Sequence, residues 1–216
     1  MKSAIAISYE LDDIGATVRE LTAQVRRGLV FTDHTVAILY GQPDMEVDEL
    51  SYALSLELGC HVFGGTMTAG ACITNEGDHE SAVVLHVLTD NNCLFAPAIS
   101  DSIKNDPAAK IAETYCEAYR NLKEQDTGAE PKLVICVTSI LENIDPDDIL
   151  SNISELCGNI PVFGFNAADD FDLRKQQIYL DGITGSDKLV ILLISGDTCP
   201  IFQIANLAGF MRVLRK

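Results

Sequence analysis

The sequence predicts an α/β protein built from two similar halves, each with the order β-α-β-α-β-loop-β-β and with mixed sheets flanked by helices. Apolar stripes of helical spacing alternate with short β-rich runs. In addition, the pentapeptide His61–Gly65 returns one hundred positions later as Pro161–Phe165, with Val-Phe-Gly in common. We therefore expect one domain over residues 1–216, with half-repeats at about 1–91 and 92–205 that arose by internal duplication, and a tail at 206–216.

Further matches on both sides of this pentapeptide support the repeat. Asp48-Glu49-Leu50 corresponds to Asp147-Asp148-Ile149 at an offset of 99, and the segment 73–77 corresponds to 178–182 at an offset of 105. The offsets grow slowly and the matches stay in the same order. This drift places an insertion in the second loop, at about residues 165–176.

Four helices are predicted from apolar stripes and from their end signals. Leu11 to Val25 forms a stripe that stops at Gly28, and Val47 to Leu58 forms one that stops at Gly59. Asp106-Pro107 and Asp145-Pro146 each place an N-cap before a proline at the first helical position. Residues 111–122 and 149–156 supply the stripes behind these caps, and Gly158 closes the last helix.

Eleven short runs rich in β-branched and apolar residues are predicted as strands. Runs that are apolar throughout, such as 189–194, indicate strands covered on both faces, and the turns at Glu76-Gly77 and Asp90-Asn91 indicate antiparallel hairpins. A charged stretch at 123–131, which contains Gly128, is a candidate linker inside the second half. The predicted strands are 4–8, 36–40, 62–64, 71–75, 82–88, 93–99, 133–138, 162–164, 177–180, 189–194 and 200–205.

The charge balance excludes several classes of partner. The net charge is −17, from 32 acidic and 15 basic residues, which opposes binding to nucleic acids and to anionic membranes. The apolar run at the N-terminus stops at Glu10 and is too short for a signal peptide or a membrane span. We therefore expect a cytoplasmic protein with neither nucleic acid nor a membrane as a partner.

The loop after the first Val-Phe-Gly strand has the residue types of a small-ligand site. Gly64, Gly65 and Gly70 would let a ligand approach the backbone amides, and Thr66 and Thr68 supply hydroxyls. The loop lacks the Lys-Ser/Thr that follows a phosphate-binding loop, and no helix with a dinucleotide fingerprint begins there. The alternative is a tight turn in which the glycines only relieve strain.

The equivalent second loop is rich in carboxylates. Its candidate ligand-binding residues include an amide, two carboxylates and a guanidinium, which would suit a zwitterion such as an amino acid. Arg174 could hold the carboxylate of that ligand. A calcium or magnesium site at Asp169, Asp170 and Asp172 lacks the spacing of a calcium loop. An ordinary solvated loop is the remaining alternative. The candidates are Phe165, Asn166, Ala167, Asp169, Asp170 and Arg174.

No arrangement of a nucleophile and a base stands out in the sequence. Cys72 and Ser81 have histidines near them in sequence only, and there is no Gly-x-Ser-x-Gly elbow. We therefore predict no catalytic residues, no resident metal and no cofactor.

The two loops resemble the signatures of FIST domains, sensory modules of bacterial signalling proteins. Val62–Gly70 is similar to the first signature, although Met67 and Ala71-Cys72 differ from its commoner form, and Val162–Asp170 is similar to the second. The resemblance covers about residues 32–197. A FIST region usually continues into a C-terminal portion, so we expect this chain, which ends at Lys216, to represent the N-terminal portion.

The resemblance implies a non-catalytic domain that binds a small ligand, with an amino acid as the candidate. It also implies a signalling partner of the kinase, cyclase or chemotaxis type, in the same chain or in another; the oligomeric state does not follow from it. Two alternatives stay open. One is an enzyme that uses Asp169 or Asp170 as a base or a metal ligand, and the other is a protein-interaction scaffold.

Overall fold

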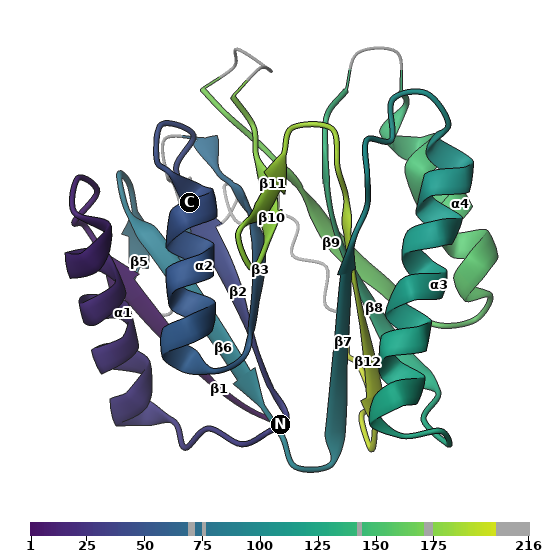
Figure 1. Cartoon of the computed structure of the whole chain (residues 1–216), viewed down its shortest axis with the longest axis horizontal. Coiled ribbons are helices and arrows are strands. Elements are labelled where there is room, and N and C mark those ends of the chain that lie inside the picture. The colour runs from purple at the N-terminus through teal and green to yellow at the C-terminus, as the bar shows by residue number, and fades with distance from the viewer. Residues whose placement is uncertain (69–71, 75–76, 142–143, 171–174, 202–216) are drawn as a thin grey trace, which may run out of the picture.

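The protein folds into four layers, with two helices, two facing sheets and two further helices in succession (Figure 1). The structure is a computed structural model that describes residues 1–68, 72–74, 77–141, 144–170 and 175–201. Within these residues no helix is both long enough and apolar enough to span a bilayer. The α/β class with mixed sheets, predicted from the sequence, is confirmed.

The elements follow one another in the same order in both halves. The first half contains β1 (Lys2–Ser8), α1 (Ile14–Gly28), β2 (Thr35–Gly41), α2 (Val47–Leu58), β3 (His61–Thr66), β4 (Cys72–Thr74), β5 (Gly77–His79) and β6 (Val83–Thr89). The second contains β7 (Cys93–Ile99), α3 (Pro107–Gln125), β8 (Pro131–Ser139), α4 (Pro146–Cys157), β9 (Val162–Ala167), β10 (Ile178–Leu180), β11 (Ile183–Gly185) and β12 (Val190–Gly196).

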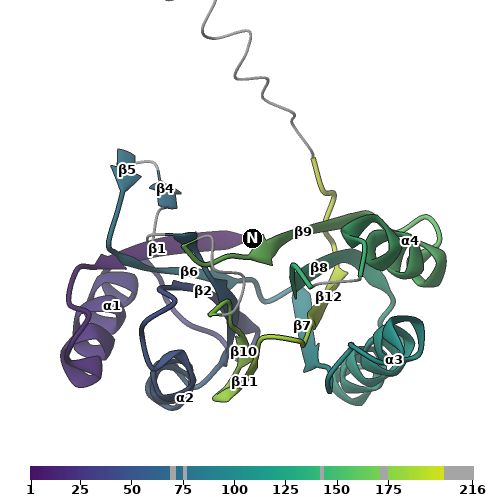
Figure 2. The same ribbon diagram turned by 90° about the horizontal axis from the view of Figure 1, so that it is seen from above.

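The strand order of the sheets also recurs, with one important difference. The first sheet has the order β1-β6-β2-β3-β10-β11, and the second has β7-β12-β8-β9. The β10–β11 hairpin therefore comes from the second half but extends the sheet of the first. Its counterpart, β4–β5, forms a separate two-stranded sheet that stands apart in Figure 2. The common order agrees with a duplication, which itself stays a prediction.

Three helices, α1, α3 and α4, begin directly after an aspartate that caps them. Asp13 and Asp106 accept hydrogen bonds from Ala16 N and Ala109 N, which satisfies amides that have no partner inside the helix. Asp145 does the same for Asp147 N, and Pro146 follows it as the first helical residue. α2 ends at Gly59, which is left-handed with φ +67°.

The expected strands agree with the structure except at the shortest elements and at the C-terminal end. The three-residue strands β5 and β11 were not predicted, because neither has an alternating or apolar run. The strand expected at 200–205 is wrong for Pro200 and Ile201, which are not in a strand, and 202–205 lie outside the described residues. β12 instead ends at Gly196 in a turn in which Thr198 N donates to Gly196 O.

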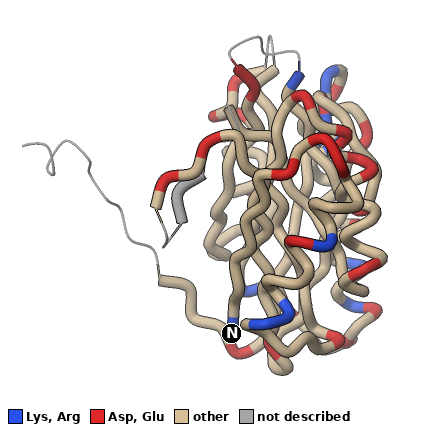
Figure 3. The backbone as a smooth tube through the Cα atoms, turned by 90° about the vertical axis from the view of Figure 1, so that its left-hand side faces the viewer, with Lys and Arg blue, Asp and Glu red and all other residues tan. Residues whose placement is uncertain are grey.

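Three apolar clusters join the four layers. The first packs α1 and α2 on the first sheet, and includes Leu21, Leu50 and Leu54. The second does the same for α3 and α4 on the second sheet. The third lies between the sheets, with Ile38, Phe63 and Leu192 among its members. The surface around this core is acidic, and red segments outnumber blue ones on the side seen in Figure 3.

The glycine of the repeated Val-Phe-Gly has a structural reason in both halves. A Cβ on Gly64 would lie 1.8 Å from the carbonyl oxygen of Leu39, and one on Gly164 would lie 2.1 Å from that of Cys136. Each glycine sits opposite that residue on the neighbouring parallel strand. Only glycine allows the two backbones to approach so closely.

Tyr179 of β10 fixes the hairpin to the first sheet. Its side chain is fully buried, and its hydroxyl donates to Leu39 O at 2.9 Å and accepts from Gly41 N at 3.0 Å. Gly65 O lies 3.1 Å from the same hydroxyl. Burial raises the pKa of this phenol well above its usual value, so it stays protonated and can donate.

We expect Tyr179→Phe to lower the free energy of unfolding by about 1–3 kcal/mol, because it leaves buried backbone groups without a partner. Urea denaturation followed by circular dichroism measures this change. The control is Tyr52→Phe, since Tyr52 is half-exposed and its hydroxyl makes no hydrogen bond among the described residues. Equal stability of the two variants would contradict the role given to the Tyr179 hydroxyl.

A histidine–aspartate pair ties the hairpin to β3 at its other end. His61 Nδ1 lies 2.6 Å from Asp181 Oδ2, while Asp181 Oδ1 accepts from Val62 N at 2.7 Å. The hydrogen bond to Asp181 raises the pKa of His61 above its usual value, although partial burial opposes this. Charged His61 therefore stabilises the folded protein below its unfolded pKa of about 6.5.

This stabilisation should be lost as the pH rises through the raised pKa of His61. We expect unfolding free energies measured at about pH 6 and about pH 8.5 to show a fall in the wild type that is larger than in His61→Gln. The difference should be at most about 1 kcal/mol, because the imidazole is more than half exposed. Parallel pH profiles of the two proteins would rule the contribution out.

Candidate functional site

The two loops predicted to form the site lie side by side. Ala168 N donates to Thr66 O at 2.8 Å, and Thr66 Oγ1 donates to Ala168 O at 2.8 Å. Thr68 Oγ1 donates in the same way to Asp169 O, also at 2.8 Å. The chain segments that follow β3 and β9 are therefore hydrogen-bonded to each other across the two sheets.

Most described members of the predicted set hold this junction together. Thr66 is buried, and its hydroxyl also accepts from Gln177 N at 3.0 Å. Asp169 is 3% exposed, and its carboxylate accepts from Lys175 N at 2.9 Å. A Cβ on Gly65 would lie 3.0 Å from that of Ala167, so the sheets touch at this glycine. These contacts leave the residues little freedom to turn toward a ligand.

Two of the predicted residues, Gly70 and Arg174, lie outside the described residues. Asp170 is exposed, as is Asn166. Asn166 and Phe165 belong to β9, and both line a groove beside that strand. Of the predicted set, these two residues mark the place where a ligand has room, and Gly164 of the same strand, which was not predicted, lines it as well.

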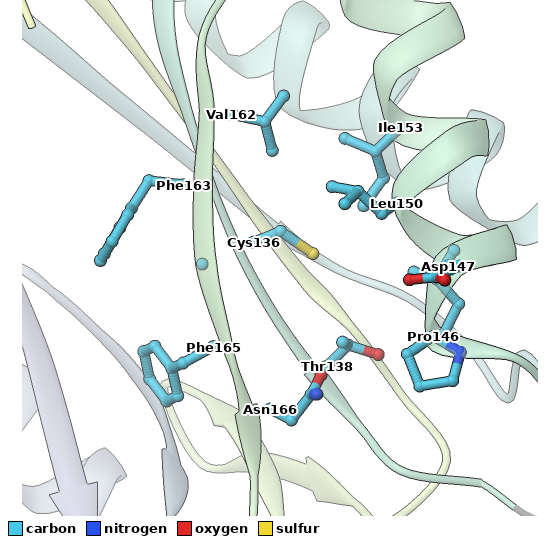
Figure 4. Close-up of a pocket in the computed structure, with 12 residues that line it drawn as sticks. Cys136, Thr138, Pro146, Asp147, Leu150, Ile153, Val162, Phe163, Phe165 and Asn166 are labelled. Atoms are coloured by element: carbon cyan, nitrogen blue, oxygen red, sulfur yellow. The ribbon is translucent and has the colours of Figure 1, made fainter. Parts of the chain in front are cut away.

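The groove has a volume of about 450 Å³ and lies between β9, β8 and α4 (Figure 4). Ile153 and Leu150 face it from α4, and Val162 faces it from β9. Phe163 and Phe165 lie on the other side of β9 in Figure 4, where the ring of Phe165 is 5.2 Å from that of Tyr40. The full lining is Cys136, Thr138, Pro146, Asp147, Ile149, Leu150, Ile153, Val162, Phe163, Gly164, Phe165 and Asn166.

The groove is the counterpart of the space that Tyr179 fills in the first half. Leu39 pairs with Gly64 and Gly41 with Thr66 in the parallel strands β2 and β3, as Cys136 pairs with Gly164 and Thr138 with Asn166 in β8 and β9. The sequence repeat likewise aligns Leu50 and Leu54 of α2 with Ile149 and Ile153 of α4. Leu39, Leu50 and Leu54 belong to the same cluster as Tyr179.

Different surroundings give the two Val-Phe-Gly strands opposite exposures. β3 is covered by β10, and Phe63 is 0% exposed. β9 pairs with β8 alone and is the edge strand of its sheet among the described residues, and Phe163 is 53% exposed. The open edge of β9 and the groove thus lie side by side in the second half. In the first half the equivalent edge, that of β3, is covered by the β10–β11 hairpin.

Thr138 places a hydroxyl without a partner at the groove. Its side chain is 8% exposed, and Oγ1 is buried and makes no hydrogen bond among the described residues. A buried hydroxyl without a partner costs about 1–3 kcal/mol of stability, so native proteins rarely retain one. Figure 4 shows the hydroxyl beside Asn166, at the same end of the groove as Asp147.

The groups around the groove are poorly suited to nucleophilic or metal chemistry. Burial raises the pKa of the Cys136 thiol to about 12, so it is protonated and weakly reactive near neutral pH. Within the described ranges, no three His, Cys, Asp or Glu side chains come together in a way that could hold a metal ion. Asp172, named in the calcium alternative, lies outside those ranges.

Sequence reasoning missed the part of the groove that α4 contributes. Ile149 and Ile153 have the spacing of core residues, and they gave no sign of lining an open space. A signal was available in the repeat itself: Ser51 of α2, whose hydroxyl accepts from Gly182 N of the hairpin, is replaced by Leu150. Gly41, next to the Tyr179 hydroxyl, is replaced by Thr138.

Comparisons with known proteins agree with the loop signatures. A comparison with curated proteins finds no match to this chain. The model of the FIST N domain matches residues 35–213, which is most of the chain and includes both loops and the groove. The chain therefore belongs to the FIST family, a family of sensory domains in signal transduction.

Proposed function

We propose that this protein is a cytoplasmic sensory domain that binds a small ligand in the groove between α4 and β9. The hydroxyl of Thr138 supports this proposal most directly, because it is a buried polar group that no described residue satisfies and that a bound molecule would satisfy. The groove has the size of a small-molecule site, with an apolar wall and a few polar groups at one end. An amino acid is the candidate ligand, with the output carried by a kinase, cyclase or chemotaxis module.

The proposed site shifts the predicted one toward α4. Asn166 stays in it and Phe165 borders it with its ring on the other face of β9, while Gly65, Thr66, Thr68, Ala167 and Asp169 would support it from behind by joining the two loops. A ligand in the groove would touch β9, whose following loop is hydrogen-bonded to the loop after β3. Binding could in this way alter the junction between the halves and be read by a signalling partner.

A protein-interaction role is the second candidate, and a specific observation favours it. β9 is an edge strand among the described residues, and Phe163 and Leu150 beside it are each 53% exposed. An extended segment of a partner could add to such an edge. The enzymatic alternative has less support, since Asp169 is buried and its carboxylate accepts from a backbone amide.

Isothermal titration of an amino-acid panel against the wild type and Thr138→Val tests the ligand proposal. Valine has the shape of threonine without the hydroxyl. We therefore expect Thr138→Val to gain about 1 kcal/mol of unfolding free energy and to bind about three- to tenfold more weakly. Gain of stability with loss of affinity is the expected signature of a hydroxyl kept for a ligand.

The matched control is Thr114→Val, because the buried Thr114 hydroxyl donates to Lys110 O at 2.7 Å, far from the groove in sequence and on another helix. This control should lose stability and keep its affinity. Absence of heat from every member of the panel, in this chain and in a version extended through a C-terminal FIST portion, would refute ligand sensing. Unchanged affinity in Thr138→Val would move the site away from the groove.

A further inference from the structure

The two ends of the groove differ in chemistry, and this difference specifies a ligand class. Cys136, Ile153 and Val162 surround one end, and Thr138 and Asn166 lie near each other toward the other, with Asp147 facing them from α4 (Figure 4). A molecule that fills the groove therefore needs an apolar body and one polar head. The following inference rests on the proposed function of ligand binding and concerns the charge of that head.

The polar end carries negative charge without a matching cation. Asp147 makes no ion pair among the described residues, and the residues that line the groove include no lysine, arginine or histidine. Asp145 and Asp148, both exposed, lie on either side of Pro146 and Asp147 and add to the negative charge. A ligand carboxylate would be repelled at this end, and an ammonium would be attracted.

The start of α4 offers no substitute for a cation. A free helix N-terminus usually binds anions through its unpaired amides. Here Asp145 Oδ1 accepts from Asp147 N at 2.9 Å, and Asp145 O accepts from Asp148 N at 3.0 Å and from Ile149 N at 3.3 Å. Pro146 has no amide hydrogen to give. The backbone donors at the start of α4 are therefore already used.

The same end has the acceptors that an ammonium needs. A primary ammonium carries three N–H donors and no acceptor. Asp147 offers carboxylate oxygens, Asn166 offers its amide oxygen, and the Thr138 hydroxyl is buried and unpartnered. One ammonium could bond to all three side chains, and it would satisfy a hydroxyl that has no partner among the described residues.

The space that the Tyr179 ring fills in the first half indicates how large the apolar part of a ligand in the groove can be. In the first half the corresponding space holds a phenol ring, and the ring ends at Gly41. A Cβ at Gly41 would lie 3.1 Å from the Tyr179 hydroxyl, and in the second half Thr138 brings such a Cβ. The groove is therefore shorter at its polar end than the space that holds the Tyr179 side chain. A branched aliphatic chain or a single unsubstituted ring fits the remaining length.

We propose that the groove is selective for primary amines with a branched aliphatic or single-ring body. Asp147, Thr138 and Asn166 hold the ammonium, and the hydrophobic wall of α4, β8 and β9 holds the body. The ligand is recognised through one positive charge. An amino acid with the same side chain binds more weakly, because its carboxylate is repelled by Asp147 and no lysine, arginine or histidine lines the groove.

Three compounds that share an isobutyl group and differ in their charged groups distinguish recognition of an ammonium from recognition of a carboxylate. We would titrate 3-methylbutylamine, leucine and 4-methylpentanoate into the whole chain by calorimetry. We expect the amine to bind at least tenfold more tightly than leucine, and the acid to give no measurable binding. Asp147→Asn should weaken the amine at least tenfold, whereas the control Asp148→Asn should change its affinity by less than about twofold.

Several outcomes would overturn the proposal. Leucine bound as tightly as the amine, or a measurable affinity for the acid, would show that the site reads a carboxylate. Loss of leucine binding in Arg174→Ala would assign that role to Arg174; amino-acid sensing would then stand and the amine selectivity would fail. Equal losses in Asp147→Asn and Asp148→Asn would mean that only the general acidic field acts. If neither the three compounds nor the amino-acid panel gave a measurable heat of binding, both the selectivity for primary amines and the ligand-sensing function would be refuted.

Discussion

The insertion of Tyr179 into the first sheet is the contact on which the asymmetry of this molecule depends. One hydroxyl meets three backbone groups of two strands, and β10, the strand that carries it, covers an edge of β3 that would otherwise be open. The second half has the same strand order and the same glycine at the same place, but no described strand covers its edge. A repeat that differs in one covering element thus produces both a closed core and an open groove.

Much of the fold follows from local signals in the sequence. The Asp-Pro caps and the apolar stripes placed the helices well, and the apolar runs placed the long strands, because these patterns depend on residues close together in the chain. β5 and β11 could not be found in this way, since three residues are too few for a pattern. The pairing of β10 with β3 is set by contacts between residues more than one hundred positions apart.

The candidate site was predicted only in part, for a related reason. The two loops do lie side by side, but the groups that suggested a ligand are largely used in hydrogen bonds, between the loops for the Thr66 hydroxyl and within the second loop for the Asp169 carboxylate. The groove depends instead on what is missing beside β9 and on one face of α4. A sequence read one element at a time reports which residues are present, and a cavity is defined by the space between several elements.

The borrowed hairpin also links the two halves during folding. Residues 178–180 pair with residues 63–65, so the first sheet cannot be completed until most of the chain has been synthesised. Pairings of such large sequence separation carry a high cost of loop closure and form slowly. The first half would then have an exposed strand edge for as long as the second half is still emerging from the ribosome. Completion of the first sheet is therefore a late event, and the first half is not expected to be a self-sufficient folding unit.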